Sequence, residues 1–245
     1  MHRFFLTESP LRVNQSVDLA PLAHQLRKVL RLAPGALITL LDNQGNEFDV
    51  RLVDLHAKGA RGEVLTTRVN RAEPEVCVTL YQCSLKADKF EWVLQKGTEL
   101  GVRCFVPVIS ERSVVRPAAA LLKKYDRWRA IMREAAEQCG RGRLPDLLDP
   151  MDWSIALHHA EGLRLFPWES RAESAPALHT LATQLLSSPG QAALLIGPEG
   201  GISTGEADQA HASGWQSVSL GPRILRAETA ALAAVTLLMA ANEPR

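Results

Sequence analysis

Two loops rich in glycine and proline contain the residues whose types and spacing best suit ligand binding. The first, Gly197–Gly201, reads GPEGG and directly follows an apolar run. The second, Gly221–Arg226, reads GPRILR and lies about one strand-helix unit further along the chain. Ligands of parallel sheets bind at the carboxyl ends of strands, so we expect the two loops to lie side by side there. Their backbone N–H and C=O groups can then bind a planar base, covered by isoleucine and leucine side chains.

Neither loop has the pattern of a phosphate site. No G-K-[ST] follows the first loop, and the carboxylate of Glu199 would repel a phosphate. Its G-x-x-G-G spacing also differs from the dinucleotide fingerprint G-x-G-x-x-G. Because neither loop offers a cluster of cations, we expect a neutral or positively charged ligand that carries an adenine-like ring.

A third pattern, Gly201–Gly205, matches the G-x-S-x-G nucleophile elbow of hydrolases. That chemistry needs a histidine on a later, separate loop, and the one later histidine, His211, falls on the same predicted helix. Ser203 and Glu206 have instead the spacing of a helix capping box. We therefore predict that Ser203 begins a helix and is not a nucleophile.

Composition limits the class of protein. The chain has 245 residues, of which 46% are hydrophobic and 22% charged, with a net charge of +1. It contains no apolar run of about 18 residues, and its N-terminus lacks a signal-peptide pattern, so we expect no membrane segment and a cytoplasmic location. The four cysteines lack C-x-x-C spacing and the histidines lack metal-ligand spacing. This argues against disulfides and metal sites and favours four small buried thiols.

Basic residues are concentrated in two zones. Residues 1–71 contain ten Lys/Arg and seven Asp/Glu, and residues 103–143 contain ten and four, so these zones carry +3 and +6. Such zones on a nearly neutral protein fit a polyanion. Solvated helix faces with acidic partners explain them equally well.

Two domains are predicted, with their boundary in the polar, proline-containing stretch 70–75. Residues 1–72 read as short strands with turns and one helix at 20–32, which suggests a small barrel. Residues 73–245 read as strands that alternate with helices, which predicts an α/β domain with a mainly parallel sheet. One long helix is expected from Pro117 to Gly140. The alanine-rich helix after Arg226 suits tight packing on the sheet, or packing against a second subunit.

Several motifs resemble those of one known family, along essentially the whole chain. The motifs are RFF (3–5), HQLRKVLRL (24–32), KADKFEWVLQKGTELGV (86–102), RWRAIMREAAEQCGR (127–141), LLIGPEGGIS (194–203) and LGPRILRAETA (220–230). In these motifs the chain resembles the ribosomal small-subunit RNA methyltransferase E family, whose members methylate N3 of a uridine in 16S rRNA and belong to the SPOUT superfamily.

The resemblance implies an N-terminal PUA-like β-barrel that binds RNA and a C-terminal SPOUT-type α/β trefoil-knot domain that binds S-adenosylmethionine. It also implies a homodimer that acts on the small ribosomal subunit. The cofactor is expected to bind to three loops, 165–169, 196–201 and 220–227. The residues expected to bind it are Leu165, Phe166, Glu169, Ile196, Gly197, Pro198, Glu199, Gly200, Gly201, Leu220, Gly221, Ile224, Leu225 and Ala227. The residues expected to bind RNA are Arg3, His24, Arg27, Lys28 and Arg31, with residues 123–143 as a second surface.

Two residues are candidates for catalysis. Methylation of uracil N3 requires removal of its proton and stabilisation of charge on two carbonyl oxygens, and the permanently charged guanidinium of Arg226 suits the second task. Glu228 is a candidate base or a residue that orients Arg226. It is equally well explained as a first-turn carboxylate that the helix dipole favours.

Two other functions remain compatible with the residues. The chain could be a different enzyme that uses an adenine nucleotide, or an RNA-binding module that has kept the fold without catalysis. Intact glycine loops argue against the second alternative.

Overall fold

The computed structural model describes residues 1–7, 10–57, 59–169, 175–185 and 190–241. These form two compact units, the first made of residues 1–73 and 136–144 and the second of residues 74–135 and 145–245. The main division falls one residue from the predicted boundary. The segment 136–144, which the sequence places in the second domain, belongs to the first unit.

The first unit is built on one five-stranded mixed sheet. Its order is β1-β3-β4-β5-β2, with β1 and β3 parallel and the other pairs antiparallel. Leu26, Ile38, Leu40 and Val50 are fully buried in its core. The strands are β1 (Arg3–Phe5), β2 (Ser16–Asp18), β3 (Leu37–Leu41), β4 (Asn46–His56) and β5 (Gly59–Val69).

Polar contacts hold the segment 136–144 to the first unit. The Asn70 amide donates to the carbonyl of Gly140 at 2.8 Å, and the guanidinium of Arg141, which is 2% exposed, donates to Glu73 at 2.9 Å. Such a buried, charge-assisted bond is stronger than a neutral one. Sequence periodicity could not reveal these contacts, because they join residues about 70 positions apart.

The predicted helix at 20–32 is correct in place but irregular in form. It consists of a 3-10 turn, η1 (Ala20–Leu22), and a π-helical turn, η2 (Gln25–Val29), in which the Leu30 N–H bonds to the Gln25 carbonyl. Leu26 is buried, but Val29, expected on the apolar face, is 63% exposed. The wider turn rotates Val29 away from the core.

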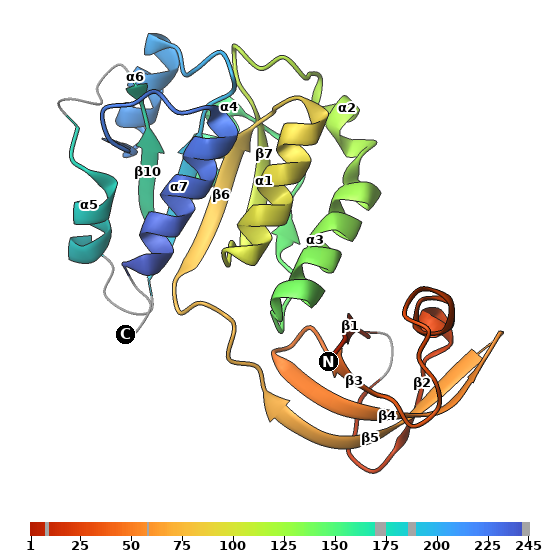
Figure 1. Cartoon of the computed structure of the whole chain (residues 1–245). Coiled ribbons are helices and arrows are strands. Elements are labelled where there is room, and N and C mark those ends of the chain that lie inside the picture. Colours follow the sequence, from red (N-terminus) through yellow and green to blue (C-terminus); the bar gives the residue numbers. More distant parts are fainter. Residues whose placement is uncertain (8–9, 58, 170–174, 186–189, 242–245) are drawn as a thin grey trace. The chain divides into compact units, whose positions relative to one another are not determined.

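The second unit confirms the predicted parallel sheet. Seven strands pair in the order β12-β10-β11-β6-β7-β8, with β9 also on β7, and every pair is parallel (Figure 1). They are β6 (Cys77–Cys83), β7 (Cys104–Ile109), β8 (Asp146–Leu147), β9 (Met151–Asp152), β10 (Leu163–Pro167), β11 (Gln191–Ile196) and β12 (Gln216–Val218).

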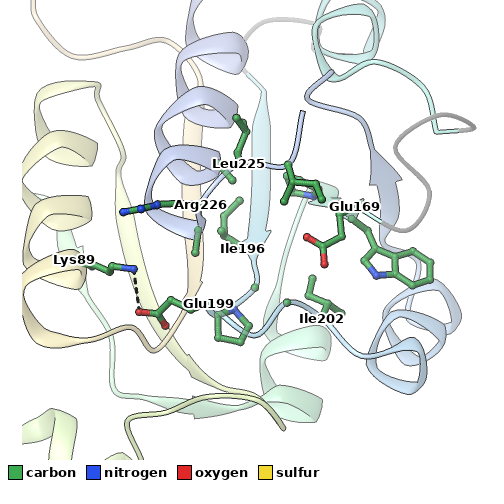
Figure 2. A pocket seen from close by; sticks show the side chains of 15 residues that line it. Lys89, Glu169, Ile196, Glu199, Ile202, Leu225 and Arg226 are labelled. Atoms are coloured by element: carbon green, nitrogen blue, oxygen red, sulfur yellow. Dashed lines mark ion pairs between the residues drawn. The ribbon is translucent and has the colours of Figure 1, made fainter. Parts of the chain in front are cut away.

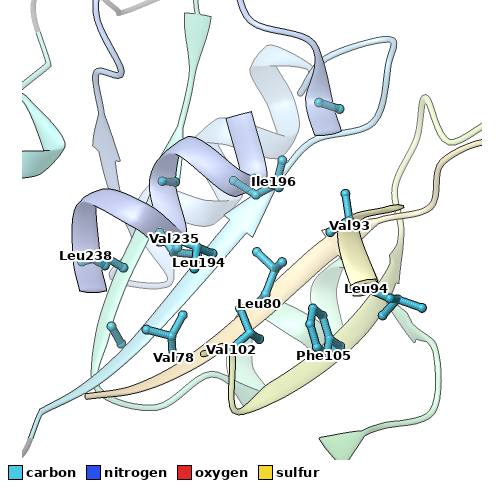
Figure 3. Close-up of a cluster of buried hydrophobic side chains, with 14 of the residues drawn as sticks. Val78, Leu80, Val93, Leu94, Val102, Phe105, Leu194, Ile196, Val235 and Leu238 are labelled. Atoms are coloured by element: carbon cyan, nitrogen blue, oxygen red, sulfur yellow. The ribbon is translucent and has the colours of Figure 1, made fainter. Parts of the chain in front are cut away.

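Helices cover both faces of this sheet. In β11, Ala192, Leu194 and Ile196 point into the core with α1, α3, α5 and α7, while Ala193 and Leu195 point into the core with α4 and α6 (Figure 3). Because successive side chains of a strand face opposite sides, a sheet covered on both faces needs continuous apolar runs. The helices are α1 (Ala87–Glu99), α2 (Ala118–Leu122), α3 (Tyr125–Cys139), α4 (Trp153–His159), α5 (Leu178–Leu185), α6 (Thr204–Ala212) and α7 (Ala227–Ala240).

The expected single helix from Pro117 to Gly140 is wrong, because the chain turns between α2 and α3 at Lys123 and Lys124. Leu121 and Tyr125 on either side of the turn are both buried, and the Tyr125 hydroxyl donates to the Leu148 carbonyl at 2.6 Å. In the turn, the Lys124 N–H donates to the Leu121 carbonyl at 2.9 Å.

The alanine-rich helix α7 packs closely on its own unit. It contacts α1, α5, β6 and β11, and Ala231 and Ala234 are fully buried. Small side chains there allow the helix to approach the sheet closely. Within the described residues, no helix has both the length and the apolar character needed to cross a membrane.

Candidate active site

Three strand ends form the site. The loops after β11 and β12 were predicted to be neighbours, but β10 pairs with both strands and lies between them. That expectation is corrected for the strands, which β10 separates, but the two glycine loops still line one cavity together, with Ile196 beside Leu225. Adjacent strands along a chain need not be adjacent in a sheet, and this insertion adds a third wall to the site.

A cavity of about 390 Å³ lies at these strand ends (Figure 2). Its volume is within the usual range for small-molecule sites, about 300–1,000 Å³. The residues that line it are Lys89, Pro167, Trp168, Glu169, Ile196, Gly197, Pro198, Glu199, Gly201, Ile202, Ile224, Leu225, Arg226, Ala227 and Ala230.

Most of the predicted cofactor residues line this cavity. The structure brings together Glu169, Ile196, Gly197, Pro198, Glu199, Gly201, Ile224, Leu225 and Ala227, and also the catalytic candidate Arg226. It places others elsewhere: Leu165 and Phe166 are fully buried in the two cores. Gly200 lies against Arg112, while Leu220, Gly221 and Glu228 are outside the lining.

Pro167 and Trp168 also line the cavity and lie in the predicted loop 165–169. Three lining residues were not predicted: Lys89, Ile202 and Ala230. Ala230 could have been found, because it lies one helical turn after Ala227 on the same face of α7. Lys89 could not have been found in this way, because it lies in α1, which is far from both glycine loops in the sequence. Only the tertiary fold places it beside the glycine loops.

Glycines give the loop 197–203 its shape. A Cβ at position 197 would lie 2.8 Å from Cγ1 of Ile202, closer than carbon atoms pack. Gly201 has φ +72°, a left-handed conformation that side chains rarely adopt, and a Cβ there would lie 3.0 Å from Oε1 of Glu169. The loop therefore presents bare backbone to the cavity.

The loop ends in the predicted capping box. Ser203 Oγ accepts from the N–H of Glu206 at 3.3 Å, and the Glu206 carboxylate accepts from the N–H of Ser203 at 3.0 Å. The Ser203 hydroxyl donates to Glu111 at 2.8 Å, and His211 instead contacts Ser217. Ser203 is thus a helix cap, as predicted, and is committed to structural hydrogen bonds.

Charged side chains gather on one flank of the cavity. Lys89 Nζ lies 3.5 Å from Glu199 Oε1 and 3.6 Å from Glu228 Oε2, so it links α1 to the loop 197–203 and to α7. Figure 2 shows Lys89, Glu199 and Arg226 on this flank, with Glu169 and Ile202 on the other. Arg226 is the N-cap residue of α7, but its side chain makes no capping hydrogen bond.

The predicted RNA-binding residues lie in the first unit. His24, Arg27, Lys28 and Arg31 are exposed, and no ion pair joins them to a carboxylate in the described part of the chain. Arg3 is half-buried, and its Nε is buried without a hydrogen-bond partner among the described residues.

The cysteines differ from the expectation of four buried thiols. All four are free, but Cys77 is exposed and Cys104 and Cys139 are half-buried. Burial raises the pKa of Cys83 to about 12, so this thiol stays protonated at neutral pH. Cys77 is the first residue of β6, and the exposed end of that strand. No group of three or more His, Cys, Asp or Glu residues suited to a metal ion occurs within the described ranges.

Comparisons with known proteins find relatives over nearly the whole chain. A family profile described as an RNA methyltransferase domain matches residues 72–239. The ribosomal RNA small subunit methyltransferase E of Synechocystis is 36% identical, over 88% of this chain and 71% of that protein. The crystal structure of the Neisseria gonorrhoeae ribosomal RNA small subunit methyltransferase E bound to S-adenosylmethionine is 38% identical, with a TM-score of 0.86 and coverage of 96% and 95%. A Legionella pneumophila structure with bound S-adenosylmethionine is 30% identical, with a TM-score of 0.87 and coverage of 98% and 97%.

The geometry of Gly201 leads to a stability prediction. Gly201→Ala should lower the free energy of unfolding by about 1–2 kcal/mol, the usual cost of a left-handed backbone at a residue with a side chain. Gly205→Ala is the matched control, because Gly205 lies in α6 and a Cβ there meets nothing within 4 Å. Urea unfolding of both variants measures the difference. If Gly201→Ala and Gly205→Ala had the same free energy of unfolding, the loop would accommodate the alanine at position 201 without loss of stability.

Proposed function

Because this chain belongs to the ribosomal RNA small subunit methyltransferase E family of RNA methyltransferases, we propose that it methylates N3 of a uridine in 16S rRNA with S-adenosylmethionine. The observation that carries the proposal is the cavity at the ends of β10, β11 and β12, which gathers both glycine loops and Arg226. We place its action in the cytoplasm, on the small ribosomal subunit.

The lining fits the proposed cofactor. Ile196, Ile202 and Leu225 supply apolar surface for an adenine ring, and the loop 197–201 supplies backbone groups for its edge. Glu169 and Glu199 supply two carboxylates to the lining, which suits a cationic cofactor, as the glutamate in GPEGG led us to expect. Two similar proteins have been solved with this cofactor bound.

Arg226 is proposed to stabilise the reacting base. S-Adenosylmethionine, when bound, supplies a sulfonium methyl group, so that N3 exchanges its proton for a methyl group and a neutral thioether remains. As the proton leaves, negative charge spreads to the two uracil carbonyl oxygens. Arg226 lines the cavity, and no hydrogen bond or ion pair joins its guanidinium to another described residue. Its donors are therefore available to one of these oxygens.

Glu228 is proposed to receive the N3 proton or to orient Arg226. Its Oε2 is buried and accepts no hydrogen bond from the described residues, while its ion pair with Lys89 spans 3.6 Å. A carboxylate in the first turn of α7 is also favoured by the helix dipole, so part of its role is structural.

The first unit is proposed to bind the RNA, through Arg3, His24, Arg27, Lys28 and Arg31. Four of these side chains are exposed and unpaired within the described residues, so they can contact phosphates. We also propose a homodimer. The 82% exposed Ile224 supports it, since this apolar side chain stands at the rim of the cavity, where a second subunit would cover it.

The direct test is methyl transfer from labelled S-adenosylmethionine to small subunits that lack the modification, compared with naked 16S rRNA, with mapping of the modified base. We expect one product, 3-methyluridine at one position. Tight binding of ATP without binding of S-adenosylmethionine would favour an adenine-nucleotide enzyme instead. No rise in melting temperature with S-adenosylmethionine would favour a non-catalytic RNA-binding module.

Substitution of Arg226 tests its role. Arg226→Ala should lower kcat by about 10²-fold or more, the usual effect of removing one donor to a developing oxyanion. The affinity for S-adenosylmethionine, measured by calorimetry, should change little, because Arg226 is assigned to the base. Arg223→Ala is the control, since Arg223 is exposed in the same loop but does not line the cavity. A normal kcat for Arg226→Ala would exclude the assignment.

Substitution of the basic stretch tests RNA binding. The double variant Arg27→Gln/Lys28→Gln should bind RNA more weakly at low salt. Its log Kd against log salt should be shallower by about 1–2, because each phosphate contact to single-stranded RNA contributes about 0.7. Arg51→Gln is the control, because Arg51 lies in the same unit but pairs with Glu63 at 3.7 Å. An unchanged slope in the double variant would place the RNA surface elsewhere.

A further inference from the structure

Lys89 is a cavity residue to which the sequence assigns no role. It lies in the first turn of α1, its side chain is 27% exposed, and it contacts Glu199 from the loop 197–203 and Glu228 from α7. Two carboxylates therefore hold one ammonium group at the edge of the cavity.

The ammonium group keeps donors available for a ligand. Its distances of 3.5 Å to Glu199 and 3.6 Å to Glu228 exceed the 2.7–2.9 Å of a charge-assisted hydrogen bond. An ammonium has three N–H donors. Within the described residues, none of them makes a hydrogen bond, so the carboxylates position the group electrostatically without saturating it.

The distribution of charge indicates which ligand Lys89 faces. Lys89 and Arg226 are the two basic residues of the lining, and both lie on the flank between α1 and α7 (Figure 2). Glu199 lies on the same flank and pairs with Lys89, so this flank carries two cations and one lining carboxylate, whereas Glu169 stands alone on the other flank. A cationic sulfonium is therefore favoured beside Glu169. A base that becomes negative as its proton leaves is attracted to the two cations. The flank of Lys89 and Arg226 therefore suits the RNA base.

Uracil has the matching pattern of groups. Its N3 is flanked by two carbonyl oxygens, each of which accepts hydrogen bonds and gains charge when N3 loses its proton. Cytosine carries an amino group in place of one of these oxygens, and that donor would face a cation. Enzymes that modify a base commonly read its Watson–Crick edge in this way.

We infer that Lys89 is a substrate-contacting residue that binds one uracil carbonyl oxygen while Arg226 binds the other, so that the pair selects uridine over cytidine. The inference rests on the proposed uridine methylation. Glu199 and Glu228 act through Lys89, as positioning residues that hold its ammonium group at the cavity edge.

The test uses the full-length protein with Lys89→Met and Lys89→Arg, and with Lys96→Met as matched control. Lys96 lies on the same helix and pairs with Glu99 at 2.8 Å, outside the cavity lining. We expect Lys89→Met to lower kcat on small subunits about 10²-fold, with an unchanged Kd for S-adenosylmethionine. Lys89→Arg should keep part of the rate, because arginine keeps the positive charge but places its N–H donors at different positions.

Two further readouts separate substrate contact from a structural role. The loss of rate in Lys89→Met should become smaller as pH rises. At high pH the solvent removes the N3 proton, so the reaction depends less on an ammonium group that stabilises the deprotonated uracil. The preference for rRNA with uridine over rRNA with cytidine at the target position should also narrow. Lys96→Met should match the wild type in rate, pH profile and preference.

Several outcomes would overturn the inference. A raised Kd for S-adenosylmethionine, with the rate restored at saturating cofactor, would assign Lys89 to the cofactor. A loss that is constant across pH and accompanied by a lower melting temperature would make Lys89 structural. Normal activity of Lys89→Met beside an active wild type would remove its role altogether. Absence of transfer by the wild type would instead contradict the proposed function itself.

Discussion

The parallel sheet of the second unit is buried on both faces, and this constraint determines where polar chemistry can occur. Alternate residues of β11 enter two different cores, so the five residues that follow Gln191 are all apolar. A charged side chain within such a strand would lose its hydration without a partner. The charged residues of the cavity, Lys89, Glu169, Glu199 and Arg226, accordingly lie outside the strands. The cavity, both glycine loops and Arg226 all lie at the carboxyl ends of β10, β11 and β12.

Features with a local cause could be predicted from the sequence. The capping box of Ser203 and Glu206 depends on residues three positions apart, and both of its hydrogen bonds are present. The parallel sheet follows from the alternation of apolar runs with helical stretches. The residues of the GPEGG loop that line the cavity were identified because glycine, proline and a carboxylate occur together directly after a buried strand.

Features with a tertiary cause could not be predicted. Strand order depends on the path of the chain, so the place of β10 between β11 and β12 has no signal in spacing. The break between α2 and α3 falls at Lys123 and Lys124, where no proline or glycine marks it in the sequence. Lys89 enters the cavity from a helix that precedes β11 by almost 100 residues. In the sequence, the amphipathic pattern of α1 does not distinguish Lys89 from an ordinary lysine on the surface of a helix.

The charges of the cavity suit a site in which two ligands, the cofactor and the RNA base, both change charge during the proposed reaction. The lining contains two acidic residues, Glu169 and Glu199, and two basic residues, Lys89 and Arg226, so it is formally neutral. A neutral lining does not bind either ligand too tightly by charge alone. Because its charges are separated, one flank favours a negatively charged ligand and the other a positively charged ligand (Figure 2). During the proposed reaction the sulfonium loses positive charge while the base carries negative charge only transiently. The fixed cations of Lys89 and Arg226 interact more strongly with the charged base than with the neutral base, which is the condition for electrostatic catalysis. Lys89 is suited to this task because Glu199 and Glu228 fix its position before the base arrives.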